Sequence, residues 1–234
     1  MFHFTPHHDF FVGIDSDGCV FDTMELKHKE CFIPNIINYY ELQAVSKYAR
    51  EAAEFVNLYS RSRGTNRFPA LIETLEWLQQ RPEVAARGVR ISVPEQLRAW
   101  IQTENKLGNP ALERRVAETG APELAHALTW SVAVNRAIAD MVRGVPPFPG
   151  VRESLQALQG RVDMVVCSAT PQEALRAEWA EHDIERYVSV ICGQEDGTKA
   201  EILQNAAPYR PAHALMIGDA LGDYRAAQAN QCLF

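Results

Sequence analysis

The chain has 234 residues, of which 47% are hydrophobic and 23% are charged, a composition typical of globular proteins. Its formal net charge of −7 argues against a nucleic-acid-binding protein that depends on general attraction to phosphates. The five cysteines are widely spaced, and the sequence shows no signal-peptide pattern and no run long enough to cross a bilayer. A reduced cytoplasmic protein that binds neither nucleic acid nor membrane is therefore expected.

The first predicted element is a short apolar strand at residues 10–15, "FFVGID". A short apolar run that ends at aspartate is typical of a buried parallel strand. Three aspartates, Asp15, Asp17 and Asp22, stand at or just beyond its end. Carboxylates this close repel one another, so the cluster requires a compensating positive charge.

The middle of the chain, residues 24–144, is predicted to be helical. Apolar residues recur at steps of three and four in five segments, at residues 35–60, 68–81, 94–108, 109–120 and 122–144. Pro34 and Asn35 are expected to mark the start of the first helix, and Gly108 and Gly120 to close two later ones. The apolar stripe of the first helix should include Leu42 and Tyr59, and that of the last should end at Met141.

Strands return after the proline-rich residues 143–151, which cannot continue a helix. We expect strands at about residues 162–168, 187–192 and 213–218, separated by helical segments. Alternating strands and helices predict an α/β fold with a parallel sheet. The expected domains are an α/β core of residues 1–23 and 145–234 and a helical insertion of residues 24–144.

Four fragments with chemically useful side chains lie at, or just beyond, the ends of the predicted strands. They are Asp15 with Asp17, Ser168, Lys199, and Asp219 with Asp223. The carboxyl ends of parallel strands meet at one crevice, so these fragments can share one site. Mg²⁺ prefers carboxylate oxygens and would relieve the repulsion among the four aspartates.

This site could transfer a phosphoryl group. An aspartate can act as the nucleophile in forming an aspartyl phosphate, and Asp15 is the first candidate. Asp17 follows two residues later, where it could protonate a leaving oxygen and then deprotonate water. Ser168 and Lys199 would face the anionic group.

These residues resemble the motifs of the haloacid-dehalogenase-like hydrolase superfamily, over residues 10–23 and about 146–232. Asp15-Ser16-Asp17-Gly18 matches its D-x-D-G motif, Asp22-Thr23 the D-[ST] that commonly follows, and Gly218-Asp219 through Asp223 its G-D-x-x-x-D motif. Ser168 and Lys199 match the second and third motifs.

The resemblance implies a Rossmann-like core with an all-helical cap inserted after the first strand. It also implies that Asp15 is the nucleophile and Asp17 the acid and base, while Ser168 and Lys199 hold the phosphoryl group. Mg²⁺ would be held by the Asp15 carboxylate, the Asp17 main-chain carbonyl and Asp219, with Asp223 supporting them.

The sequence departs from the family pattern at several positions. Cys19 replaces a frequent threonine, Ala169 replaces a frequent asparagine, and Lys199 lacks its usual following proline. We interpret Cys19 as a residue that fills the loop rather than as a reactive thiol. Relatives also typically continue beyond the position of the final "QCLF".

The expected function is a Mg²⁺-dependent phosphatase that acts on a small soluble phosphomonoester. Asp17 favours phosphate-ester chemistry, because dehalogenases and phosphonatases of this superfamily lack that acid. A phosphomutase acting on a sugar phosphate, or a binding protein without catalysis, remains an alternative. Basic residues of the insertion could contact substrate or be solvated; they are Lys27, Lys29, Arg61, Arg63 and Arg67.

Overall fold

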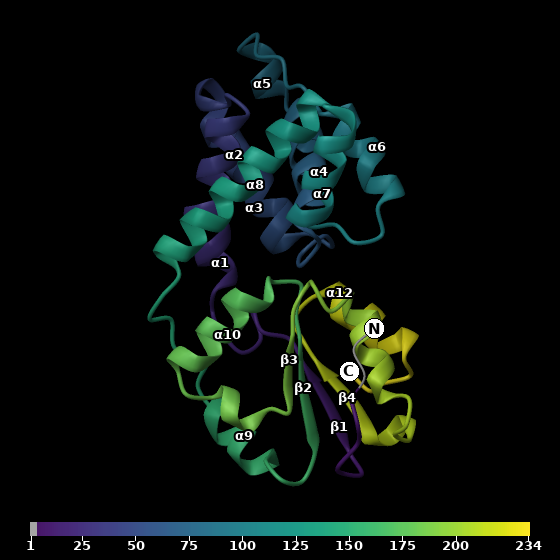
Figure 1. Cartoon of the computed structure of the whole chain (residues 1–234). Helices are drawn as coiled ribbons and strands as arrows, with labels where there is room; N and C mark the ends of the chain where they lie inside the picture. The colour runs from purple at the N-terminus through teal and green to yellow at the C-terminus, as the bar shows by residue number, and fades with distance from the viewer. Residues whose placement is uncertain (1–3) are drawn as a thin grey trace. The chain divides into compact units, whose positions relative to one another are not determined.

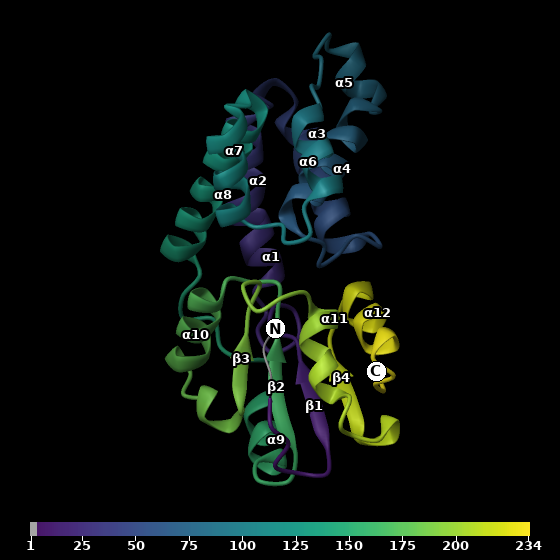
Figure 2. The same cartoon turned by 45° about the vertical axis from the view of Figure 1, so that its right-hand side comes forward.

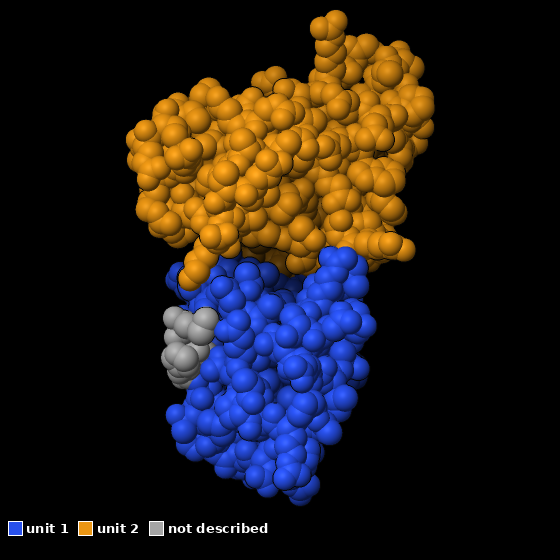
Figure 3. Space-filling view, turned by 90° about the vertical axis from the view of Figure 1, so that its right-hand side faces the viewer, with its two compact units in different colours: residues 1–24, 143–234 blue, residues 25–142 orange. Residues whose placement is uncertain are grey.

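The structure, a computed structural model, describes residues 4–234. The chain divides into two compact units, which Figure 3 colours separately. Unit 1 contains the chain up to Met24 together with Arg143–Phe234, and unit 2 is Glu25–Val142. The sequence placed these junctions at residues 23/24 and 144/145, one or two residues from those in the structure.

A four-stranded parallel sheet forms the centre of unit 1, as the sequence predicted (Figure 1). Its strands stand in the order β3-β2-β1-β4. Their bounds are Phe11–Ile14 for β1, Asp163–Cys167 for β2, Val190–Cys192 for β3 and Ala214–Ile217 for β4. All four residues of β1 and all five of β2 are buried. This burial explains why the sequence of each strand is almost entirely apolar rather than alternating between apolar and polar residues.

Helices cover both faces of this sheet (Figure 2). Val12 and Ile14 of β1 pack with α9 and α10, whereas Phe11 points to the opposite face and packs with α11 and α12. The helices of unit 1 are α9 (Val151–Leu158), α10 (Gln172–Glu181), α11 (Lys199–Ile202) and α12 (Leu221–Ala229), with 3₁₀ turns at Glu185–Tyr187, Leu203–Ala206 and Pro211–His213.

The four strands end within one residue of one another, since Ile14 pairs with Val166, the residue before the end of β2. Ile14, the last residue of β1, pairs with Ile217, the last residue of β4. Cys167 pairs with Cys192 in the same way at the ends of β2 and β3. The residues that follow each strand therefore emerge at one edge of the sheet, as the sequence argument required.

The opposite edge of the sheet anchors the N-terminal segment. The buried carboxylate of Asp163, the first residue of β2, accepts hydrogen bonds from the backbone N–H groups of His7 and His8, both at 2.9 Å. The hydroxyl of Tyr209 donates to the same oxygen at 2.6 Å. Burial opposes ionisation of Asp163, but these hydrogen bonds outweigh it and lower its pKa. Asp163 thus holds together three segments of unit 1.

Unit 2 is helical, and residues 25–142 contain no strand. Its core is aromatic and aliphatic, and Trp130, Leu71, Leu75 and Leu97 are completely buried or nearly so. The helices are α1 (Met24–Leu26, which begins at the junction), α2 (Ile33–Tyr39), α3 (Ser46–Glu54), α4 (Arg67–Gln79), α5 (Pro82–Ala86), α6 (Glu95–Thr103), α7 (Asn109–Thr119) and α8 (Pro122–Met141), with π-helical turns η1 (Lys27–Phe32) and η3 (Phe55–Tyr59) and a 3₁₀ turn at Gln43–Val45.

The sequence predicted one continuous helix over residues 35–60. This prediction is wrong, because the helix starts earlier and is interrupted. Helical structure already begins at Met24 and runs through Pro34. A π-helical turn precedes Pro34, in which the N–H of Ile33 bonds to the carbonyl of His28. Proline has no N–H to donate, and the wider turn accommodates it. The helix then breaks at Glu41, whose φ of 54° is incompatible with a right-handed helix.

Three further residues of unit 2, Gly108, Tyr59 and Met141, differ from the prediction, whereas Gly120 agrees with it. The helix α6 ends at Thr103, and Gly108 instead precedes α7 in an extended conformation. Gly120 does close α7, in a left-handed conformation. Tyr59 and Met141, expected in apolar stripes, are 59% and 48% exposed, and each is the last residue of its helical segment. No helix among residues 4–234 has the length and hydrophobicity needed to cross a membrane.

Candidate active site

The loop after β1 is fixed by its own backbone and by the sheet. The N–H of Asp15 donates to the carbonyl of Ile217 at 2.9 Å, which ties the end of β1 to β4. The carbonyl of Ser16 accepts N–H groups from Val20 and Phe21 at 2.8 and 3.0 Å. Such a tight turn requires a positive φ, and Gly18 supplies it at 84°.

A buried side-chain contact adds to this rigidity. The indole N–H of Trp179, on α10, donates to the hydroxyl of Ser16 at 3.1 Å, and both residues are completely buried. Ser16 stands between Asp15 and Asp17, so helix α10 positions the segment that carries both aspartates. Sequence reasoning did not identify this contact, which joins residues 163 positions apart.

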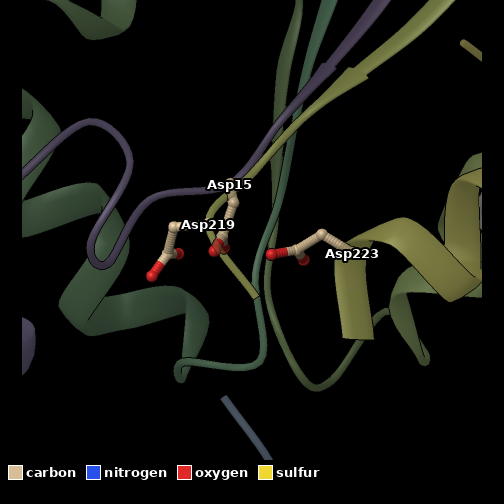
Figure 4. A group of neighbouring side chains, drawn as sticks. All are labelled: Asp15, Asp219 and Asp223. Atoms are coloured by element: carbon tan, nitrogen blue, oxygen red, sulfur yellow. The ribbon is translucent and has the colours of Figure 1, made fainter. Parts of the chain in front are cut away.

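Three predicted aspartates gather at the edge of the sheet, as Figure 4 shows. Carboxylate oxygens of Asp15, Asp219 and Asp223 all lie within 4.8 Å of one another. Asp15 is 4% exposed and Asp223 is completely buried, whereas Asp219 is exposed. An all-oxygen set of carboxylates fits Mg²⁺, a hard cation that prefers oxygen ligands.

Lys199 supplies the positive charge inside this cluster. Its ammonium nitrogen lies 2.8 Å from Asp15 Oδ1 and 2.5 Å from Asp223 Oδ1. Burial opposes the charge on Lys199, but the two carboxylates outweigh burial and raise its pKa. Lys199 begins α11 directly after Thr198, whose side chain caps that helix through a capping box with Glu201. The lysine therefore stays charged and in place.

Both carboxylate oxygens of Asp223 accept hydrogen bonds from other residues of the protein. Its Oδ1 accepts the Lys199 ammonium, and its Oδ2 accepts the N–H of Ala220 at 3.0 Å. This arrangement suits a residue that supports the site. Asp15 and the exposed Asp219 are better placed as direct metal ligands.

The ionisation of Asp15 depends on its surroundings. Burial raises the pKa of Asp15 to about 7; Lys199 opposes this shift, and the carboxylates of Asp223 and Asp17 add to it. A cation bound between Asp15 and Asp219 would stabilise the ionised form of Asp15. Burial and the three neighbouring aspartates raise the pKa of the Cys19 thiol to about 12, which agrees with an unreactive thiol.

Asp17 lies in the same loop, but its side chain is not part of the three-aspartate cluster. The hydroxyl of Thr23 donates to Asp17 Oδ1 at 2.5 Å, and the hydroxyl of Thr170 donates to Asp17 Oδ2 at 2.7 Å. Sequence reasoning noted Thr23 only as part of a motif and missed Thr170. The one available signal was a hydroxyl residue two positions after Ser168.

Ser168 directly follows β2 and is 2% exposed. Its N–H donates to the carbonyl of Cys192, the last residue of β3, at 3.1 Å. Its side-chain oxygen accepts the N–H of Thr170 at 3.2 Å. The hydroxyl proton is therefore free to point away from that N–H and to be donated to another group.

Three of the basic residues flagged in unit 2 have partners within that unit. The guanidinium of Arg63 donates to the carbonyl of Leu58 at 3.2 Å. The ammonium of Lys29 lies 2.7 Å from Glu25, one helical turn earlier. The guanidinium of Arg67 donates to the Ser131 hydroxyl and to Asn135 at 3.0 and 2.6 Å. Burial lowers the pKa of Arg67 to about 10. These contacts favour a structural role for Arg67, which joins α4 to α8.

Comparisons with known proteins agree with this fold. The family model for haloacid dehalogenase-like hydrolases matches residues 12–230. A comparison with curated proteins finds no match.

Solved structures with the same fold include a predicted phosphoglycolate phosphatase from Haemophilus somnus 129PT, which is 15% identical. The alignment covers 97% of this chain and 84% of that one, with a TM-score of 0.58. A haloacid dehalogenase-like hydrolase from Bacteroides fragilis is 14% identical over 95% of this chain and 84% of its own, with a TM-score of 0.57. A Thermotoga maritima protein assigned as a β-phosphoglucomutase is 16% identical over 95% and 82%, with a TM-score of 0.50. Identities this low establish the shared fold alone, whereas the family model spans almost the whole chain. The chain therefore belongs to the haloacid dehalogenase-like hydrolase family.

Proposed function

We propose that this protein is a Mg²⁺-dependent phosphatase that removes phosphate from a small soluble phosphomonoester through an aspartyl-phosphate intermediate. One observation carries the proposal. The carboxylate oxygens of Asp15, Asp219 and Asp223 converge within 4.8 Å at the edge of the sheet, beside the ammonium of Lys199. This arrangement joins a nucleophile, oxygen ligands for a cation and a fixed positive charge.

The residues present suit magnesium. Asp15 and Asp219 would hold the ion with the main-chain carbonyl of Asp17, and Asp223 would support them through Lys199 and the start of α12. When bound, the ion supplies positive charge to the phosphoryl oxygens and to the Asp15 carboxylate.

The protein side chains would then carry out two displacements at phosphorus. In the first, an Asp15 oxygen bonds to phosphorus, the bond from phosphorus to the ester oxygen breaks, and that oxygen takes a proton from Asp17. In the second, water attacks the same phosphorus and gives a proton to Asp17. The bond from phosphorus to Asp15 breaks, and inorganic phosphate leaves.

Lys199 and Ser168 would hold the phosphoryl group during both steps. The Lys199 ammonium contacts the Asp15 carboxylate, so it lies where negative charge increases in the transition state. The Ser168 hydroxyl accepts one backbone N–H and retains its own proton for donation to a phosphoryl oxygen.

A panel of phosphorylated metabolites, assayed for phosphate release with Mg²⁺ and with EDTA, tests this function. We expect turnover of at least one ester with Mg²⁺ and loss of detectable turnover in the Asp15→Asn variant. Asp22→Asn is the matched control, because Asp22 lies in the same loop but is exposed. Unchanged turnover in Asp15→Asn, or no turnover of any ester, would refute the proposal. Isomer formation without release of phosphate would identify a phosphomutase instead.

A further inference from the structure

The side chain of Asp17 is held at both of its oxygens by hydroxyl groups from two different parts of the chain. Thr23 lies six residues further along the same loop, and its hydroxyl donates to Oδ1 at 2.5 Å. Thr170 lies 153 residues away in the loop after β2, and its hydroxyl donates to Oδ2 at 2.7 Å. The orientation of Asp17 therefore depends on how the loops after β1 and β2 are placed relative to each other.

Thr170 is itself fixed by its neighbours. Its N–H donates to the side-chain oxygen of Ser168 at 3.2 Å, and its carbonyl accepts the N–H of Gln194 at 3.1 Å. Gly193 allows this close approach, because a Cβ added there would lie 2.8 Å from the Thr170 carbonyl oxygen. The loop after β3 thus supports Thr170, and Thr170 presents its hydroxyl from a rigid backbone.

We propose that Thr170 is a positioning residue that aims the carboxyl group of Asp17 at the oxygen of the leaving alcohol. This inference rests on the proposed function, in which Asp17 gives its proton to that oxygen. A carboxyl group free to rotate about its two side-chain bonds would spend less time in the productive geometry. Loss of the Thr170 hydroxyl should therefore slow this displacement more for an ester whose leaving oxygen needs a proton than for one whose leaving oxygen does not.

Two aryl esters of nearly the same shape separate these effects. Phenyl phosphate releases a strongly basic oxygen that needs a proton, whereas p-nitrophenyl phosphate releases a much less basic one. The quantity to measure is kcat/KM, which reports on steps up to the first irreversible one and so on phosphoenzyme formation. The ratio of the two values, taken on one preparation, does not depend on the fraction of enzyme that is folded.

In Thr170→Val we expect the ratio of kcat/KM for phenyl phosphate to that for p-nitrophenyl phosphate to fall about 10-fold or more, part of the roughly 10²–10⁴-fold contributed by general acid catalysis. Thr170→Ser keeps the hydroxyl and should restore the ratio to near the wild-type value. Tyr209→Phe is the control, since it removes a hydroxyl that bonds Asp163 at the opposite edge of the sheet and should leave the ratio unchanged.

Other results would overturn the inference. An equal fall for both esters in Thr170→Val, no change for either, or a ratio in Thr170→Ser as low as that in Thr170→Val would each show that Thr170 does not position Asp17. These outcomes differ from failure of the proposed function, in which the wild type hydrolyses neither ester with Mg²⁺ or Asp15→Asn retains activity. If the proposed function failed in either of these ways, the inference about Thr170 would lose its basis too.

Discussion

Gly218 offers a direct test of how closely the acidic cluster is packed. A Cβ added at this position would lie 2.5 Å from both Cγ and Oδ2 of Asp223 and 2.6 Å from its Cβ. These distances are far inside normal van der Waals contact, so Asp223 would have to move. Asp223 cannot move without cost, because it is completely buried and bonds to Lys199 and to the N–H of Ala220.

The size of the effect in Gly218→Ala follows from these contacts. Loss of the hydrogen bond that Asp223 makes to the start of α12 costs about 1 kcal/mol. Forcing a methyl group into a packed site costs about 1–3 kcal/mol. We therefore expect a loss of about 2–4 kcal/mol and a fall in Tm of about 5–15 °C. If Mg²⁺ binds as proposed, it should raise Tm, and displacement of Asp223 should weaken that rise.

The matched control is Gly222→Ala in the first turn of α12. A Cβ at Gly222 meets no atom within 4 Å, and alanine favours helix over glycine by up to about 1 kcal/mol. Calorimetry with Mg²⁺ and with EDTA should therefore give opposite shifts in Tm for the two variants. The reasoning is refuted if Gly218→Ala melts like the wild type and keeps its full response to Mg²⁺, or if Gly222→Ala is equally destabilised.

The remaining predictions concern charge and close packing elsewhere in unit 1. Because burial raises the pKa of Asp15 from 3.8 to about 7, ionisation of Asp15 destabilises the metal-free fold increasingly as pH rises through this range. Asp15→Asn in EDTA should therefore melt above the wild type at pH 8, with the difference closing toward pH 4; a constant difference would contradict this. Asp163 has a lowered pKa, so its stabilising effect is present above pH 3.8 and is lost as pH falls through its pKa in the folded protein. Denaturant unfolding at pH 7 should show a loss of about 2–3 kcal/mol in Asp163→Ala and a smaller loss in Tyr209→Phe. Gly193→Ala would place a Cβ 2.7 Å from the backbone nitrogen of Gln172, and we expect a lower Tm together with reduced turnover.

Some features of the fold follow from local sequence alone. The strands of unit 1 are short apolar runs because helices bury both of their faces, and such runs are visible without a structure. The ends of β1 and β4, which lie level in the parallel sheet, then bring Asp15 and Asp219 to one edge, although they are 204 residues apart. Helix breaks were harder to predict. The turn at Glu41 depends on a left-handed backbone conformation, and glutamate is not a residue type from which that conformation would be predicted.

Sequence by itself determined which residue types stand at the strand ends, and therefore the family and the candidate nucleophile. Tertiary structure alone decided which of these groups bond to each other. Asp223 binds Lys199 and the start of α12 rather than standing as a third free ligand, and Thr170 and Trp179 hold the loop of Asp17 across gaps of more than 150 residues. The physical reason is that a hydrogen bond depends on distances of a few tenths of an ångström. Those distances are set by packing between segments that are far apart in the sequence, and a local sequence pattern does not determine that packing.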